Sequence, residues 1–271
     1  MPELPEVENV ARMLRPEVVG RRIVEAQVLW PRTVAYPAPE AFCQGVVGRE
    51  VTSVGRRGKV LTLGLSGGGW LLVHLRMSGR LLLERPEGPV PAHLRVALQL
   101  HDGRELRFVD PRKFGRLWLV EDPAEVLGSL GPEPLDAAFT VEAFQARLAG
   151  RRARIKPLLL DQRFLAGVGN IYADEALFLA RVHPCRAAGS LTEEEVGRLH
   201  GALREVLAAA ILDGGTTLSA YRRPDGSPGE HQALLQVFRR AGEPCPRCGM
   251  PVARAVVGGR GTYFCPRCQA G

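Results

Sequence analysis

Two features of membrane and exported proteins are missing from this sequence. No apolar run reaches the length of a membrane span. The first residues, Met1-Pro2-Glu3-Leu4-Pro5-Glu6, are acidic where a secretory signal would be basic and then apolar. We therefore expect a protein that has no membrane partner and resides in the cytoplasm. Internal repeats and low-complexity tracts are missing as well, which argues against a repeat architecture.

Lysine is scarce, because only Lys59, Lys113 and Lys156 occur among the 36 basic residues. The codon usage of a GC-rich genome is the simplest explanation. Where a lysine nevertheless occurs, its ammonium group is a candidate for a specific role that arginine does not fill.

Cysteine is also rare, and four of the six cysteines stand in two pairs. Their pattern is C-x2-C-x16-C-x2-C, formed by Cys245, Cys248, Cys265 and Cys268. Cytoplasmic thiols are normally reduced unless they hold a metal, so we favour one structural zinc over vicinal disulfides or a redox pair. Four thiolates close the site and exclude a catalytic metal. Cys43 and Cys185 are expected to be small buried hydrophobes.

The balance of charge is basic, with a net charge of +7 over 271 residues. Between Tyr221 and the C-terminal end, eight arginines stand against three acids. A basic region favours a polyanionic partner such as nucleic acid, through release of counterions. The alternative is a solvated basic face with no ligand.

Periodicity divides the chain into regions of different structure. Apolar residues at helical spacing predict a helix over Glu3–Leu14, with Pro2 at its first position and Pro16 and Gly20 ending it. Short segments rich in Val and Leu predict an all-β block, a sandwich, over residues 22–120. The predicted strands are Ile23–Leu29, Val60–Leu65, Trp70–Leu75, Leu81–Leu83, Val96–Leu100, Leu106–Val109 and Leu117–Val120.

The rest of the chain reads as helical, after a linker at Gly131-Pro132-Glu133-Pro134. A glycine turn at Gly167–Asn170 leads into a helix to about Ala180, and a capping box at Thr192–Glu195 starts another to about Leu212. The polar segment Tyr221–Glu230 is expected to be a mobile loop.

The N-terminus has a possible chemistry of its own. If Met1 is removed, Pro2 carries a secondary amine that is partly neutral near pH 7. Attack of this amine on a sugar C1′ gives an iminium ion, which acidifies the C2′ hydrogen and promotes β-elimination. Glu3 and Glu6 lie on one helical face, suitably placed for proton transfer. An ordinary helix start with acids in its first turn is the alternative.

Several segments, in order along the whole chain, resemble the formamidopyrimidine-DNA glycosylase family. They are Met1–Glu8, His74-Leu75-Arg76-Met77-Ser78-Gly79, Asp110-Pro111-Arg112-Lys113-Phe114-Gly115, Gly167–Ala173 and Gly258–Thr262 together with the cysteine pairs. The resemblance implies a bifunctional glycosylase and lyase of base excision repair. It would act on double-stranded DNA with oxidised bases or abasic sites, as a monomer, and associate with the nucleoid when bound.

The resemblance also implies roles for individual residues. Pro2 resembles the Schiff-base nucleophile, Glu3 the proton donor that opens the sugar ring, and Glu6 its support. Lys59 resembles the lysine of β-elimination, and Arg260 the proton donor of δ-elimination. The implied DNA-binding residues are Met77, His93, Arg112, Phe114, Arg151, Asn170 and Tyr172.

Within this set, Asn170 and Arg260 would hold phosphates. Met77 would fill the gap left by the flipped base, Phe114 would intercalate, and Arg112 would hydrogen-bond the orphaned base. His93 and Arg151 resemble further phosphate contacts. The alternatives are a solvated Lys59, an Asn170 N-cap, a turn residue at Arg260, and core positions for Met77 and Phe114.

The predicted fold class is α+β multidomain. Its domains are residues 1–131 (N-terminal helix and β-sandwich), 135–240 (helical, with a helix-two-turn-helix) and 241–271 (C-terminal zinc ribbon). Two other functions stay open: an endonuclease VIII-like enzyme for oxidised pyrimidines, and a non-catalytic zinc-ribbon DNA-binding protein. Leu4 and the Arg112–Phe114 wedge favour the branch directed at purines.

Overall fold

The computed structural model describes residues 1–85, 87 and 90–270, and the chain forms two compact units. The first comprises Met1–Ser129 and Asp213–Gln232, and the second comprises Leu130–Leu212 and Ala233–Gly271. The region predicted as a helical domain, residues 135–240, therefore includes a segment that packs with the first unit. In the described residues, no helix has both the length and the apolarity that crossing a membrane requires.

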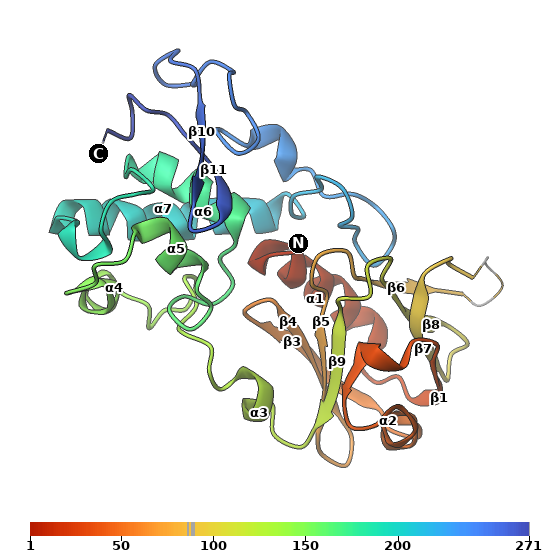
Figure 1. Cartoon of the computed structure of the whole chain (residues 1–271). Coiled ribbons are helices and arrows are strands. Elements are labelled where there is room, and N and C mark those ends of the chain that lie inside the picture. Colours follow the sequence, from red (N-terminus) through yellow and green to blue (C-terminus); the bar gives the residue numbers. More distant parts are fainter. Residues whose placement is uncertain (86, 88–89, 271) are drawn as a thin grey trace. The chain divides into compact units, whose positions relative to one another are not determined.

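Helix α1 (Leu4–Val18) opens the first unit (Figure 1). Its N-cap is Glu3, so Pro2 precedes the helix. The prediction that Pro2 occupies the first helical position is therefore wrong. Pro16 does not end the helix either. A proline in the last turn removes only one intrahelical hydrogen bond, and the apolar spacing continues to the fully buried Val18.

Two sheets share one hydrophobic core with α1, which confirms the predicted β-sandwich. The four-stranded sheet has the order β1-β7-β8-β6 and the five-stranded sheet the order β2-β9-β5-β4-β3. All neighbours are antiparallel except β2 and β9. The strands are β1 (Ile23–Val28), β2 (Val34–Tyr36), β3 (Val51–Arg57), β4 (Val60–Leu65), β5 (Trp70–His74), β6 (Arg80–Glu84), β7 (Leu94–Leu100), β8 (Glu105–Val109) and β9 (Arg116–Val120).

Strands β2 and β3 and the helices α2 (Pro39–Val46) and α3 (Ala124–Leu127) were not predicted from the sequence. Strand β3 lies at a sheet edge, and only Val51 and Val54 of its residues are buried. An edge strand with so few apolar residues carries almost no period-two signal.

The segment Asp213–Gln232 is hydrogen-bonded within the first unit. Leu83 N donates to Pro224 O (3.1 Å), and Gly229 N donates to Thr217 Oγ1 (2.8 Å). The buried Tyr221 donates its hydroxyl to Gly214 O (3.2 Å). These contacts give the predicted loop at Tyr221–Glu230 a defined path.

Over its described residues, the second unit contains four α-helices and a β-hairpin. Helix α6 (Asn170–Ala180) is buried on nearly all sides because α5 (Ile155–Leu160), α7 (Glu193–Leu212) and strand β11 (Arg260–Phe264) pack around it. Helix α7 begins with the predicted reciprocal cap between Thr192 and Glu195. The remaining elements are α4 (Val141–Leu148), β10 (Ala253–Val257) and β11 (Arg260–Phe264).

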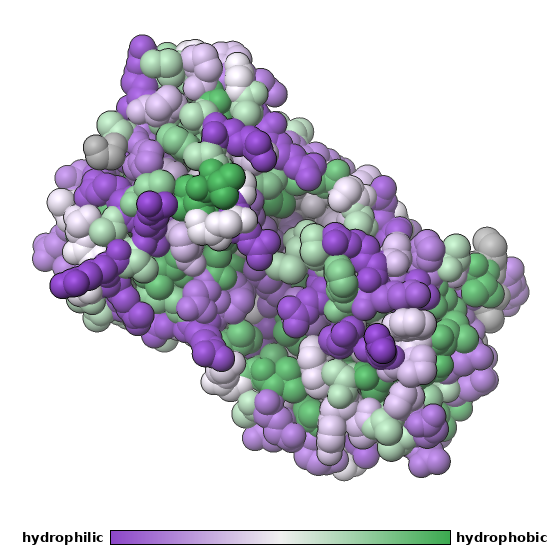
Figure 2. Space-filling view, viewed as in Figure 1, coloured by the Kyte–Doolittle hydropathy of each residue, from purple (hydrophilic) through white to green (hydrophobic). Residues whose placement is uncertain are grey.

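The surface is mainly hydrophilic in the view of Figure 2, and apolar residues reach it only as separate patches. Among the large apolar side chains exposed in the described residues are Met77 and Phe114.

Candidate functional site

The start of α1 is built around the buried carboxylate of Glu6. Its Oε2 accepts a hydrogen bond from Glu3 N (2.7 Å), and its Oε1 accepts one from Thr216 N (2.8 Å). Glu6 therefore joins the N-terminal turn to the segment Asp213–Gln232. Pro2 and Glu3 are buried beside it.

Helix α1 packs along β3, and its N-terminal end is directed toward the β3–β4 turn. Arg15 Nε donates to Val54 O (2.8 Å), and Glu8 Oε2 pairs with Arg56 Nε (2.8 Å). The step from Arg15 to Glu8 covers about 10 Å of helix, and the step from Val54 to Arg56 covers about 7 Å of strand. The N-terminal end of α1 and the C-terminal end of β3 therefore lie at the same end of the pair. The turn that follows β3 at this end contains Lys59.

Lys59 is 6% exposed, so it is not the solvated hairpin lysine considered as an alternative. His74 pairs across the sheet with Val60, the residue that follows Lys59. Burial, followed by the charges of Arg76 and Lys59, lowers the pKa of His74 to about 3. The imidazole is therefore neutral at pH 7, and it accepts a hydrogen bond from Arg76 N at Nδ1 (3.0 Å).

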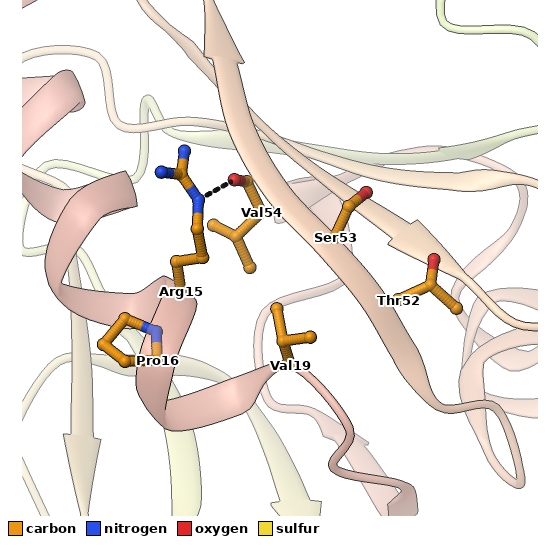
Figure 3. A pocket seen from close by; sticks show the side chains of 6 residues that line it. All are labelled: Arg15, Pro16, Val19, Thr52, Ser53 and Val54. Carbon is orange, nitrogen blue, oxygen red and sulfur yellow. Dashed lines mark hydrogen bonds between the residues drawn. The ribbon is translucent and has the colours of Figure 1, made fainter.

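A hollow of about 460 Å³ lies farther along α1, and none of the predicted site residues line it (Figure 3). Its lining residues are Arg15, Pro16, Val19, Thr52, Ser53 and Val54. The Nε of Arg15 is already bonded to Val54 O, as Figure 3 shows. We assign this hollow no function.

Two turns of the first unit expose apolar side chains. Met77 follows β5 and is 44% exposed, and Phe114 lies between β8 and β9 and is 48% exposed. Both are therefore surface residues and not part of the core. Arg112 is exposed as well, with its guanidinium carbon 4.9 Å from the centre of the Phe114 ring. His93 is exposed at the start of β7.

The four paired cysteines of the second unit converge on one point. All four Sγ atoms lie within 4.8 Å of one another, with 3.5 Å between Cys248 and Cys265 and 3.9 Å between Cys245 and Cys268. Sulfurs bound to a tetrahedral zinc at about 2.3 Å would be about 3.8 Å apart. The donor set and spacing therefore fit one zinc ion, which would staple a hairpin with little core of its own.

Arg260 lies beside the tip of this hairpin. The tip residues Gly258 and Gly259 have φ of 57° and 73°, which favours glycine in a two-residue hairpin turn. Arg260 is the first residue of β11 and is exposed. It is thus a strand residue next to the turn, with its side chain available to a ligand.

Asn170 is not an N-cap, because Gly169 occupies that position. Its Nδ2 instead donates to Gly261 O (2.9 Å), next to Arg260. Its Oδ1 is buried and has no hydrogen-bond partner in the part of the chain that the structure describes. Asn170 therefore links the start of α6 to the hairpin strand that carries Arg260.

A buried ion pair, which sequence reasoning missed, reinforces this link. Lys156 Nζ lies 2.7 Å from Asp174 Oδ1, and it also donates to Gly261 O (3.0 Å) and Thr262 Oγ1 (2.8 Å). Asp174 Oδ2 accepts from Tyr263 N (3.0 Å). Burial raises the pKa of Asp174 to about 7, although Lys156 acts to lower it. The scarcity of lysine was the one available signal for this role.

Two further predicted residues lie in the second unit. Arg151 is exposed and its guanidinium is 5.8 Å from the centre of the Phe164 ring. Tyr172 has no exposed surface, so direct contact with DNA would require its ring to leave the core.

Comparison with known proteins covers nearly the whole chain. Three family models match in order: the formamidopyrimidine-DNA glycosylase N-terminal domain over residues 1–117, the H2TH domain of the same glycosylase over residues 130–222, and a zinc finger found in FPG and IleRS over residues 242–271. A formamidopyrimidine-DNA glycosylase of Symbiobacterium thermophilum is 52% identical, and the match covers 99% of this chain and 89% of the relative.

The chain belongs to the formamidopyrimidine-DNA glycosylase family.

Another formamidopyrimidine-DNA glycosylase, from Herpetosiphon aurantiacus, is 48% identical over 100% of both chains. The crystal structure of MutM (Fpg) from Thermus thermophilus matches with a TM-score of 0.90 at 51% identity, covering 99% of this chain and 98% of that one. The Lactococcus lactis Fpg in complex with DNA containing an abasic site matches with a TM-score of 0.93 at 35% identity, covering 99% and 100%.

Membership of the formamidopyrimidine-DNA glycosylase family confirms several predictions. The α+β multidomain fold with a helix-two-turn-helix domain is confirmed, and so is the C-terminal zinc finger with its four cysteines. The chain is a DNA-repair glycosylase, and the two alternative functions are not favoured. The roles of individual site residues and the domain boundaries remain predictions.

Proposed function

We propose that this chain excises oxidised purines, 8-oxoguanine and formamidopyrimidines, from double-stranded DNA and then cleaves the strand. One observation carries the proposal: the start of α1, with Pro2 and Glu3, and the buried Lys59 lie at the same end of the α1–β3 pair. An amine, a carboxyl group and an ammonium group that share a water-poor site can combine nucleophilic and acid–base catalysis.

The proposed first step replaces the base by the protein. The Pro2 nitrogen bonds to C1′ as the C1′–base bond breaks, and the amine proton that the nitrogen gives up leaves with the base. Glu3 gives a proton to the ring oxygen, so the sugar opens and an iminium ion remains on C1′. Glu6 already accepts hydrogen bonds from Glu3 N and Thr216 N, which suits it to hold Glu3 in place.

The proposed elimination steps follow from the iminium ion, which withdraws electrons from C2′. Lys59, after losing its own proton, accepts a proton from C2′, and the electron pair of that C–H bond expels the 3′ phosphate in β-elimination. A second elimination, with Arg260 as the proton donor, expels the 5′ phosphate. Water then hydrolyses the imine and frees the Pro2 amine. A zinc ion held by the four cysteines would take no part in these steps, because four thiolates would leave no open ligand position, and it would serve to hold the hairpin.

The proposed DNA contacts belong to two groups. Phosphates would be held by Asn170 and Arg260, with His93 and Arg151 as further contacts. Met77, Phe114 and Arg112 would enter the stack where the damaged base has left it. Their exposure in the described residues supports this, since a large apolar side chain on a surface marks an interaction site when it stands beside basic groups.

A second substrate class has support of its own. The wild-type Lactococcus lactis Fpg, 36% identical with a TM-score of 0.93, has been solved with DNA containing an oxidised pyrimidine. The same protein has been solved with Fapy-dG DNA, at 36% identity and a TM-score of 0.92. We place purines first because Leu4, Arg112 and Phe114 favour the purine branch.

Borohydride trapping on duplex DNA tests the proposal. Duplexes carry 8-oxoguanine, an oxidised pyrimidine or no lesion, and mass spectrometry first checks that the protein begins at Pro2. We expect a covalent adduct with 8-oxoguanine DNA that Pro2→Gly weakens and blocking of the amine abolishes. Full trapping by amine-blocked protein would refute Pro2 as nucleophile, and binding without any adduct would favour a non-catalytic protein.

We also propose a cytoplasmic location, with association to the nucleoid when the protein is bound to DNA. A monomer is the expected working form.

A further inference from the structure

The exposed side chains of Met77 and Phe114 stand on two turns that meet at one buried carboxylate. The first turn closes with a hydrogen bond from Gly79 N to Leu75 O (2.9 Å). The second runs from Asp110 to Gly115. Met77 directly precedes Ser78 in the first turn, and Phe114 directly precedes Gly115 in the second.

Asp110 is bonded to both turns. Its Oδ1 accepts from the hydroxyl of Ser78 (2.5 Å) and from Arg112 N (3.1 Å), and its Oδ2 accepts from Gly115 N (2.8 Å). The residue has no exposed surface, and among the described residues its carboxylate has these three donors and no cation. One buried anion thus holds the immediate neighbours of both exposed apolar residues.

The same two turns also rest on one aromatic ring. A Cβ at Gly115 would come within 2.3 Å of Phe108 Cζ, and a Cβ at Gly79 would come within 2.9 Å of the same atom. Both positions therefore require glycine so that the turns can approach Phe108, which is 1% exposed in the core. The carboxylate and the ring together leave the turns little freedom to move apart.

Backbone strain in both turns agrees with such a fixed arrangement. Arg76 has φ of 53° and Lys113 has φ of 61°, in the left-handed region that non-glycine residues rarely adopt. Strained backbone persists only where its surroundings determine it. For Lys113 the surroundings include Trp30, whose ring centre lies 3.9 Å from the lysine Nζ.

We propose that Asp110 is a positioning residue that fixes the Met77 and Phe114 turns as one preformed wedge. The inference rests on the proposed role of these side chains in base flipping. A wedge must replace the stacking that a base loses as it leaves the duplex. Turns that had to become ordered at that moment would add the lost conformational entropy of several residues to the barrier. A preformed wedge has no such penalty.

Asp110 acts through the turns and does not touch the substrate, because it is wholly buried beneath them. Its loss should therefore affect only the step that opens the stack. Excision of a paired, stacked base depends on that step. Cleavage at a preformed abasic site does not, because no base has to leave the stack there.

Asp110→Asn is the informative change, because an amide group keeps the shape but turns one acceptor into a donor that faces a backbone N–H. Ser78→Ala is a milder second variant that removes a single bond to the carboxylate. Asp122→Asn is the matched control, since Asp122 accepts a bond from Ala124 N (2.8 Å) in an exposed turn of the same unit. Thermal unfolding of all variants checks that they fold.

Single-turnover rates on two duplexes are compared, one with 8-oxoguanine opposite cytosine and one with an abasic site. We expect Asp110→Asn to slow base excision about tenfold or more, as for a lost buried hydrogen-bond acceptor. Ser78→Ala should slow it less, Asp122→Asn should not change it, and abasic cleavage should stay within about threefold of wild type in all three. Equal slowing on both duplexes would refute the proposal.

A double-mutant cycle with Phe114→Ala separates positioning from general structural damage. If Asp110 acts through the wedge, adding Asp110→Asn to Phe114→Ala should slow excision by less than Asp110→Asn does alone, and adding it to a variant with both Met77→Ala and Phe114→Ala should slow excision no further. Additive losses would overturn the inference while leaving the wedge itself intact. If Phe114→Ala and Met77→Ala both excise at the wild-type rate, the wedge assignment fails, and the role of Asp110 fails with it.

Discussion

Lys156 and Asp174 form a fully buried ion pair, 2.7 Å long, in the second unit. The pair joins α5 to α6, and its remaining hydrogen bonds reach Gly261, Thr262 and Tyr263 of β11. The strand that presents Arg260 is therefore held by charges that water does not reach.

Lys156→Met should destabilise the protein strongly, by about 3–5 kcal/mol, because it leaves the buried carboxyl group of Asp174 without its partner. Adding Asp174→Asn should restore part of the loss, since the amide oxygen can still accept from Tyr263 N. Chemical denaturation measures both effects. Lys113→Met is the control, because that lysine is exposed and its loss should change stability by less than about 1 kcal/mol. If Lys156→Met alone were as stable as wild type, the structural role of the pair would be contradicted.

The metal prediction concerns the hairpin. We expect one zinc per chain by elemental analysis, lost on Cys265→Ser or on chelation, with weaker binding to every duplex because Arg260 loses its support. Cys185→Ser should retain both zinc and affinity, since Cys185 stands outside the cluster. Active protein free of zinc would show that the hairpin folds without the ion.

Arg112 should decide which base is accepted opposite the lesion. Its guanidinium group offers only donors, which suit the acceptors of cytosine better than the donor edge of adenine. A polar edge left unsatisfied in the stack costs about 1–3 kcal/mol. Single-turnover excision of 8-oxoguanine opposite each base should show a preference for cytosine that Arg112→Ala reduces about tenfold. Arg21→Ala should leave the preference unchanged, since Arg21 is a half-buried arginine already paired with Asp102. The same cytosine-to-adenine ratio in Arg112→Ala would place the selectivity elsewhere.

His74 should make the protein less stable in mild acid. Its pKa is lowered to about 3 in the folded state, mainly by burial, against an ordinary value of 6.5. Between these values the unfolded chain takes up a proton that the folded protein does not. The stability that the neutral His74 contributes is therefore fully present above pH 6.5. It is lost as the pH falls below that value, by up to about 1.4 kcal/mol per pH unit.

The comparison of wild type with His74→Asn between pH 5 and pH 7 isolates this effect, because all other titrating groups are shared. The amide oxygen of asparagine can still accept from Arg76 N. We expect the free energy of unfolding of the variant to fall less between pH 7 and pH 5. Parallel pH profiles would mean that the imidazole is protonated in the folded state.

The sequence by itself determined the features that depend on residues close together in the chain, namely the zinc ligands, helix α7 and most strands. The zinc ligands follow from spacing alone, because two closely spaced cysteine pairs suit a tetrahedral metal wherever the chain takes them. Helix α7 follows from its capping box and periodicity, and most strands follow from short runs of Val and Leu. The matched segments also placed Pro2, Lys59 and Arg260 in candidate roles before any fold was known.

Only the tertiary structure decided which polar groups are buried and what they hold. The sequence could not show that Lys59 is buried while Met77 and Phe114 are exposed, because burial depends on neighbours far along the chain. The sequence around Asp110 indicates only a turn residue, yet its carboxylate accepts a hydrogen bond from Ser78 in another turn. Lys156 bonds to a hairpin residue more than a hundred positions away in the sequence. Edge strand β3 and the return of Asp213–Gln232 to the first unit were equally hidden, since their partners lie in distant segments and leave no local periodicity.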